Sequence, residues 1–223
     1  MGPGATNDFL ERLARLTPAR RDQDHLPTLV YSDPTTPDRS DAVFGTGPSP
    51  LPAMTRGIDF LNQAGCAMIA IPCNSAHIWY DDLAAASKAP ILHIVDTAAA
   101  QLEQRGVRTV GVMATDGTCR AGIYPSRLDR FGIQTIDLTD LETDNPIMRG
   151  IRAYKAGNDP EARELVLRGG KELAKRGAEA LVFGCSDISA ALPDVTAVDG
   201  IRVVDASECL AHASINALVQ SQF

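Results

Sequence analysis

The sequence predicts an α/β protein of two pseudo-symmetric lobes, each a parallel sheet flanked by helices, with a binding site in the cleft between them. Short apolar runs alternate with segments of helical period, which is typical of βαβ units. One pattern of glycine, apolar run and cysteine also occurs twice, about half the chain apart. The 223 residues are enough for one large domain or two small ones.

The first half of the chain is predicted to alternate helices with short strands. Apolar residues at helical spacing indicate helices, and short apolar runs that end in turn residues indicate buried strands. Residues 32–40 are rich in Pro, Asp, Ser and Thr and are predicted to form a loop. The expected elements are helices over 7–16, 51–64, 75–87 and 97–105, and strands over Leu26–Tyr31, Ala67–Pro72 and Ile91–Val95.

The second half repeats this rhythm. Strands that are separated by helices pair in parallel, and the helices then cover both faces of the sheet. The expected elements are strands over Thr109–Met113, Gln134–Leu138, Ala180–Phe183 and Arg202–Val204, and helices over 124–130, 145–157, 161–176 and 208–219.

The repeated pattern places one cysteine at the end of a strand in each half. In both copies a glycine precedes an apolar run, and a cysteine ends it: Gly65 leads to Cys73, and Gly177 leads to Cys185. Two similar lobes explain this repeat most simply, although the last strand and helix could close either lobe. The predicted boundaries are residues 1–98 with 207–223 for the first lobe and 99–206 for the second.

Composition excludes several classes of protein. The formal net charge of −7 argues against a nucleic-acid or anionic-membrane partner, because both need a concentrated positive surface. The apolar run Ala67–Pro72 is far shorter than the roughly 18 residues of a membrane span. The five cysteines form no CxxC pair, so neither a zinc site nor a redox motif is indicated. Free thiols of this kind predict a reducing, cytoplasmic setting.

Cys73 and Cys185 are the predicted catalytic residues. Open α/β sheets bind ligands at the carboxyl ends of their strands, and a cysteine there adjoins the next helix, whose dipole lowers the thiol pKa. Two such thiols across one cleft suit inversion at carbon, since one thiolate removes the Cα proton and the other thiol delivers a proton. The alternative is a pair of buried core cysteines. The polar residues that follow each cysteine favour the catalytic role.

Two segments carry a resemblance to a known family: Pro72-Cys73-Asn74-Ser75-Ala76-His77 and Gly184-Cys185-Ser186-Asp187. They resemble the two signatures of the cofactor-independent aspartate/glutamate racemase family, and are most similar to its aspartate racemase branch. Further segments resemble that branch in the same order: Met1-Gly2-Pro3, 22–27, 37–40, 114–118 and 154–157. The resemblance implies a site between two α/β lobes, no pyridoxal phosphate or other cofactor, no metal, and a homodimer.

The resemblance also implies which residues bind an acidic amino acid. Arg39 and Lys155 are expected to bind its side-chain carboxylate. Taken alone, Arg39 is more simply interpreted as a solvated loop residue, and Lys155 as a charge that interacts with a helix dipole. Other donors at the cleft would hold the α-carboxylate and the charge that develops on it: Asn74, Ser75, Thr115, Thr118 and Ser186.

Two residues beside the cysteines have an open role. Asp187 could bind the substrate ammonium group or tune Cys185, and its alternative is to cap the following helix. His77 could orient the site, and its alternative is a structural hydrogen bond. Of the other cysteines, Cys66 and Cys209 are expected in the core and Cys119 in a loop.

The sequence departs from the branch in three places. Ser75 and Ser186 stand where threonine is usual, and Asp187 stands where glutamate is usual. The branch also has a strand and glycines before its Met-Gly-Pro stretch, so the first lobe is expected to lack its first strand. We expect a natural reading frame that extends upstream by about 8–12 residues, the length of a short strand and a turn.

The resulting expectation is a racemase for aspartate, or glutamate, that uses two thiols and no cofactor. Related activities stay open: a hydantoin racemase, a maleate isomerase or an arylmalonate decarboxylase type. Arg39 together with Lys155 favours a dicarboxylate, and paired thiols favour proton exchange on both faces. A non-catalytic amino-acid-binding relative is the remaining alternative.

Overall fold

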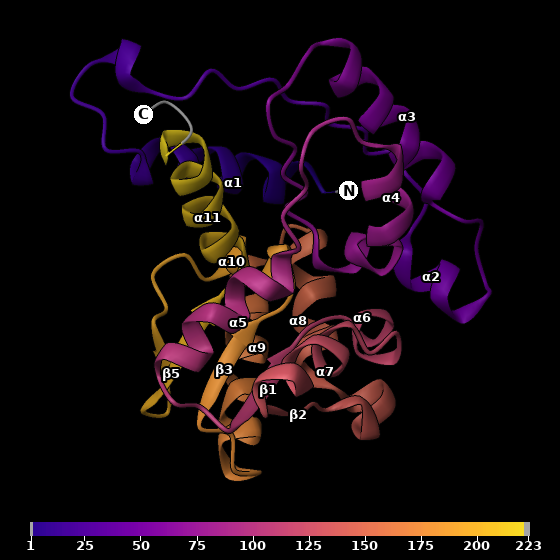
Figure 1. Cartoon of the computed structure of the whole chain (residues 1–223). Coiled ribbons are helices and arrows are strands. Elements are labelled where there is room, and N and C mark those ends of the chain that lie inside the picture. The colour runs from indigo at the N-terminus through magenta and orange to yellow at the C-terminus, as the bar shows by residue number, and fades with distance from the viewer. Residues whose placement is uncertain (1, 221–223) are drawn as a thin grey trace.

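The computed structural model describes residues 2–220 and confirms the α/β fold class (Figure 1). Its sheet has the strand order β2-β1-β3-β5-β4. Four strands are parallel, and only β4 runs antiparallel to its neighbour β5. The strands are β1 (Thr109–Met113), β2 (Gln134–Ile136), β3 (Ala180–Phe183), β4 (Ala197–Val198) and β5 (Ile201–Asp205).

Helices surround the sheet and also build most of the first lobe (Figure 1). The α-helices are α1 (Pro3–Leu16), α2 (Arg39–Phe44), α3 (Leu51–Gln63), α4 (Tyr80–Ala86), α5 (Ile94–Gln104), α6 (Asp116–Arg120), α7 (Ile123–Leu128), α8 (Pro146–Lys155), α9 (Asp159–Lys175), α10 (Ser186–Ala191) and α11 (Ala206–Gln220). The 3-10 helices are η1 (Asp22–Asp24), η2 (Asn74–Trp79), η3 (Asp129–Phe131) and η4 (Thr139–Asp144).

The inner strands β1 and β3 are buried on both faces, which explains why their sequences are mostly apolar. Successive side chains point to opposite faces of a strand. Val112 and Val182 therefore pack in one cluster with α5, α7 and α11, whereas Leu181 and Phe183 pack in another with α8 and α9. The register places Met113 beside Phe183, so the segments that follow β1 and β3 leave the sheet at the same edge.

The first lobe has a smaller core and, within residues 2–220, no hydrogen-bonded ladder. Its core joins α3 and α4 to the segment before Cys73 through Ile58, Ile71 and Leu83. The predicted strands Ala67–Pro72 and Ile91–Val95 are reduced to one parallel bridge between Ile69 and Ile91. The second of these predictions was wrong at its end, because His93 caps α5 by accepting a hydrogen bond from the Val95 N–H.

The strand predicted over Leu26–Tyr31 was also wrong. This segment has no regular secondary structure, and Leu29 is 47% exposed. A strand is defined by its hydrogen-bonded neighbour, and no backbone-to-backbone bond joins residues 26–31 to another described segment. Tyr31 instead packs its ring against Phe60 of α3, with 5.4 Å between the ring centroids.

A buried arginine connects the first and last helices. Arg12 of α1 donates to Asp8 and Glu208 and lies 3.0 Å from Asp205. It also donates to the carbonyl oxygen of Ser189 in α10. These contacts place α1 against α10 and α11, and α11 packs on the sheet as well as on α1. The residue boundaries of the two lobes stay a prediction.

Candidate active site

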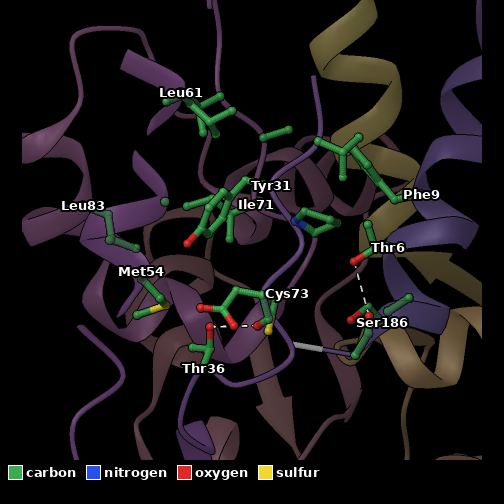
Figure 2. A pocket seen from close by; sticks show the side chains of 18 of the residues that line it. Thr6, Phe9, Tyr31, Thr36, Met54, Leu61, Ile71, Cys73, Leu83 and Ser186 are labelled. Carbon is green, nitrogen blue, oxygen red and sulfur yellow. Dashed lines mark hydrogen bonds between the residues drawn. The ribbon is translucent and has the colours of Figure 1, made fainter. Parts of the chain in front are cut away.

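One cavity of about 680 Å³ contains both predicted catalytic cysteines. Cys73, Thr36 and Ser186 lie on its lower side in Figure 2, with Leu61 and Phe9 above them. The cavity therefore has a polar side at the cysteines and an apolar side in the first lobe. All the predicted site residues line it: Arg39, Cys73, Asn74, Ser75, Thr115, Thr118, Lys155, Cys185, Ser186 and Asp187.

Cys73 lies at the start of η2, where the segment from Ala67 enters this helix. The side chain is 9% exposed and lines the cavity. Its Sγ atom is 3.5 Å from the Ser75 hydroxyl, which stands two residues further on. A hydroxyl at that distance can donate to a thiolate or accept from a thiol, so it suits both protonation states.

Cys185 occupies the matching place after β3, at the start of α10. Its thiol is 8% exposed and donates to an Asp187 carboxylate oxygen at 3.9 Å. Burial raises the pKa of Cys185, and the negative charges of Asp187 and Cys73 raise it further. The expected lowering by the helix N-terminus was wrong for this thiol, because loss of hydration outweighs the dipole of a short helix.

Arg39 enters the cavity from the first turn of α2, a helix that begins inside the predicted loop over residues 32–40. Asp38 begins this helix by accepting hydrogen bonds from the Ser40 and Asp41 N–H groups. Arg39 Nη1 donates to the carbonyl oxygen of Pro37 at 2.9 Å, and its buried Nε has no hydrogen-bond partner among residues 2–220. The guanidinium is thus held in place with donor capacity left over.

Lys155 reaches the same region from the end of α8. Its Nζ lies 3.8 Å from an Asp187 carboxylate oxygen, and its side chain is 47% exposed. Burial raises the pKa of Asp187, although Lys155 and Arg39 act in the opposite direction. Arg39 and Lys155, from different lobes, are the cationic side chains among the described residues that line the cavity. The two predicted cations therefore line the same cavity, and both act on the Asp187 carboxylate.

Thr115 and Thr118 stand beside a close contact between α6 and α2. Thr115 caps α6 by accepting a hydrogen bond from the Thr118 N–H, and the two hydroxyls are 2.9 Å apart. Gly117 between them packs against α2: a Cβ there would lie 2.6 Å from the Ser40 Oγ and 2.7 Å from the Ser40 Cα. Only glycine fits this approach. It keeps the threonine pair beside the helix that carries Arg39.

Asn74 is buried, and its partner is a residue that the sequence analysis missed. The Tyr124 hydroxyl of α7 donates to Asn74 Oδ1 at 2.7 Å, while Asn74 Nδ2 has no partner among the described residues. Ser75 stands two residues after Cys73 and Ser186 one residue after Cys185, and both are buried at the cavity wall. A lone tyrosine in a short helix carries no sequence motif, so only its spatial contact reveals it.

His77 has the structural role that was its alternative. Its Nε2 donates to the carbonyl oxygen of Ile71 at 3.0 Å, and the residue does not line the cavity. Burial lowers the pKa of His77 to about 4, so the ring is neutral at physiological pH. Cys209 lies in the main core, as predicted. Within residues 2–220, no group of three or more His, Cys, Asp or Glu side chains could hold a metal ion.

The fold and this cleft define a class of protein. One cysteine follows a strand of the parallel sheet, a second cysteine comes from the first lobe, and both line the same cavity. This is the architecture of a racemase, a type of isomerase. The chain belongs to the Asp/Glu/Hydantoin racemase family, whose model matches residues 1–214. Each α-helix between residues 2 and 220 falls short of the length and apolar character needed to cross a bilayer.

Several known proteins are similar to the chain over most of its length. The structure of the Picrophilus torridus aspartate racemase superposes with a TM-score of 0.86 and 31% identity, over 97% of this chain and 90% of that chain. The broad specificity amino-acid racemase RacX of Bacillus subtilis is 26% identical over all of this chain and 96% of its own length. The glutamate racemase of Symbiobacterium thermophilum is 31% identical over 88% of this chain and 72% of its own length.

Proposed function

We propose that the protein interconverts L- and D-aspartate by transferring protons between Cys73 and Cys185, with no cofactor. The observation that carries this proposal is the placement of the two thiols, one from each lobe, in a single cavity that also contains Arg39 and Lys155. Two thiols provide an acid and a base, and two cations provide a site for a dicarboxylate.

The reaction needs one proton removed and one delivered at the same carbon. A thiolate at one cysteine takes the Cα proton, and the electron pair left on carbon spreads into the α-carboxylate. The thiol of the other cysteine then gives its proton to the opposite face of the carbon. The reverse reaction exchanges the two roles. The cysteine that gained a proton must lose it, and the other must regain one, before the next turnover.

Charge at the cavity wall supports this sequence of steps. The raised pKa of Cys185 keeps it a thiol at neutral pH, which is the form needed to deliver a proton. Arg39 and Lys155 offset the side-chain carboxylate of the substrate while negative charge develops on the α-carboxylate. Asn74 Nδ2 and the hydroxyls of Ser75 and Ser186 are donors for the α-carboxylate. Asp187, beside Cys185 in the cavity wall, is a carboxylate for the ammonium group.

A broader substrate range is the second candidate. The cavity of about 680 Å³ is several times larger than aspartate, and its first-lobe side is apolar. It would admit glutamate and neutral side chains, and one similar protein is a racemase of broad specificity. Arg39 and Lys155 favour acidic substrates over the others.

A panel of amino acids tests the proposal. The L and D forms of aspartate, glutamate and several neutral and basic amino acids are incubated with the protein in D2O, without added cofactor. Inversion with uptake of deuterium at Cα is expected for aspartate, at the highest rate of the panel. Inversion that is fastest for a neutral amino acid would replace the first candidate with the second. No exchange for any member would contradict both. The cytoplasmic location and the homodimer stay predictions.

A further inference from the structure

Tyr124 contacts the segments of both cysteines. Its side chain belongs to α7 and is 1% exposed, so its hydroxyl needs a partner inside the protein. That partner is Asn74, the residue directly after Cys73, at 2.7 Å. A hydrogen bond therefore joins the second lobe to the residue that follows the first-lobe cysteine.

The other side of the Tyr124 ring lies against the residue before Cys185. A Cβ at Gly184 would lie 3.0 Å from Tyr124 Cε2 and 3.1 Å from the Tyr124 hydroxyl oxygen. These distances are shorter than ordinary contacts of a Cβ atom, so the ring occupies this place because residue 184 has no side chain. The Tyr124 ring therefore lies between the backbone before Cys185 and the Asn74 side chain.

The Tyr124 hydrogen bond also decides which end of the Asn74 amide is left for a ligand. Since Oδ1 accepts from Tyr124, the free end is Nδ2, which has two N–H donors and no partner within the described chain. A buried donor without an acceptor is unfavourable, and the cavity that Asn74 lines is the place from which an acceptor can come. Without Tyr124 the amide could turn and present an oxygen to a carboxylate.

We infer that Tyr124 is a positioning residue for the substrate carboxylate. It holds the Asn74 amide with its Nδ2 donor free for that carboxylate, and it keeps Asn74 beside the Cys185 segment. This inference rests on the proposed racemase function. In this role Tyr124 neither contacts the substrate nor transfers a proton. Its whole effect on the reaction is exerted through Asn74.

A double-mutant cycle tests this route. Tyr124→Phe removes one oxygen and keeps the ring, and we expect kcat/KM for aspartate to fall by about tenfold, the effect of one net hydrogen bond, mostly through KM. In an Asn74→Ala background the same change is expected to have no further effect. Tyr80→Phe is the matched control, because the Tyr80 hydroxyl donates to the Ile91 carbonyl oxygen outside the cavity. Its kinetics should match the wild type.

Asn74→Asp provides a second variant that leaves Tyr124 unchanged. A carboxylate at position 74 still accepts from the Tyr124 hydroxyl but offers no donor, so its kcat/KM should fall at least as far as that of Asn74→Ala. The inference is overturned by wild-type kinetics in Tyr124→Phe or Asn74→Asp, or by a full tenfold loss from Tyr124→Phe in the Asn74→Ala background. A wild-type protein that inverts no amino acid would instead overturn the proposed function, and the role of Tyr124 with it.

Discussion

The two lobes hold their cysteines by different means. Cys185 follows β3, which is hydrogen bonded to β1 on one side and to β5 on the other. Cys73 follows a segment whose bridge pairing, within residues 2–220, is the single pair Ile69–Ile91. A paired strand fixes the direction of its last residues, whereas a segment with one bridge needs other contacts to do so.

Side-chain hydrogen bonds and one local backbone bond supply those contacts in the first lobe. His77 donates back to the carbonyl oxygen of Ile71, and the Cys73 N–H donates to the same residue at 2.8 Å. Tyr124 holds Asn74 from the other lobe. The difference teaches that equivalent positions at the two ends of a repeat can be fixed by a backbone ladder in one lobe and by side-chain hydrogen bonds in the other.

Loss of either thiol should have the largest effect on activity and should show which face of the substrate each lobe serves. Cys73→Ser and Cys185→Ser are each expected to lower racemisation by about 10²–10⁴-fold, because a serine hydroxyl is far too weak an acid to replace a thiolate base. Each variant should exchange the Cα proton of at most one enantiomer in D2O, which assigns one face of the substrate to each lobe.

Cys119→Ser is the matched control for these two changes, because Cys119 does not line the cavity. It should racemise aspartate at the wild-type rate. Normal racemisation by Cys73→Ser or Cys185→Ser would remove the two-thiol mechanism.

Core substitutions should show that the sheet carries most of the stability. Leu181→Ala in β3 removes a fully buried side chain and is expected to lower the free energy of unfolding by about 2–5 kcal/mol. Val30→Ala, in the exposed segment of the first lobe, should change it by less than about 0.5 kcal/mol. Urea denaturation measures both. An equal loss in the two variants would mean that residues 26–31 are packed as firmly as the sheet.

Removal of Arg39 should show what the first lobe contributes to substrate binding. Arg39→Ala is expected to lower kcat/KM for aspartate roughly 10- to 150-fold. This corresponds to the loss of about 1.5–3 kcal/mol of transition-state stabilisation from a charge-assisted hydrogen bond to a carboxylate. Arg21→Ala removes a solvent-exposed arginine as a control and should leave the kinetics unchanged. Steady-state assays measure kcat and KM of both variants. Unchanged kinetics in Arg39→Ala would rule out the dicarboxylate site.

A change in charge beside Cys185 should move the pH dependence. Cys185 acts as a base only when deprotonated, so exchange by this residue becomes faster as the pH rises. Its raised pKa moves this increase to higher pH. Asp187→Asn removes a negative charge that raises this pKa, and exchange should therefore begin at lower pH. The Cα exchange rate in a Cys73→Ser background, from about pH 6 to about pH 10, isolates this base.

Asp194→Asn, on an exposed surface pair with Arg163, is the control for that profile. Its pH dependence should equal that of the parent. A profile that stays in place after Asp187→Asn would show that burial alone sets the pKa of Cys185.

Elements with a local signal could be predicted from the sequence. The strands Thr109–Met113 and Ala180–Phe183 were predicted at the residues where β1 and β3 lie, because each is an apolar run between turn residues. The short helices α2, α6 and α10 were missed, since five or six residues contain too few turns to show a helical period. The strand over Leu26–Tyr31 failed because pairing depends on a neighbour that periodicity does not identify.

The site divides in the same way. Cys73, Cys185, Arg39 and Lys155 stand in recognisable segments, and the structure brings all four to one cavity. Tyr124 could not be predicted, because its importance comes from a contact across 50 positions of sequence. The pKa of Cys185 was predicted in the wrong direction, because burial is a property of the packed protein.

The contact between Gly184 and the Tyr124 ring has a consequence for how this protein can change through evolution. Every substitution at position 184 adds at least a Cβ where the ring already lies. An added Cβ would push the ring by a few tenths of an ångström and so strain its hydrogen bond to Asn74. We therefore expect a side chain at position 184 to be tolerated best together with a change at position 124.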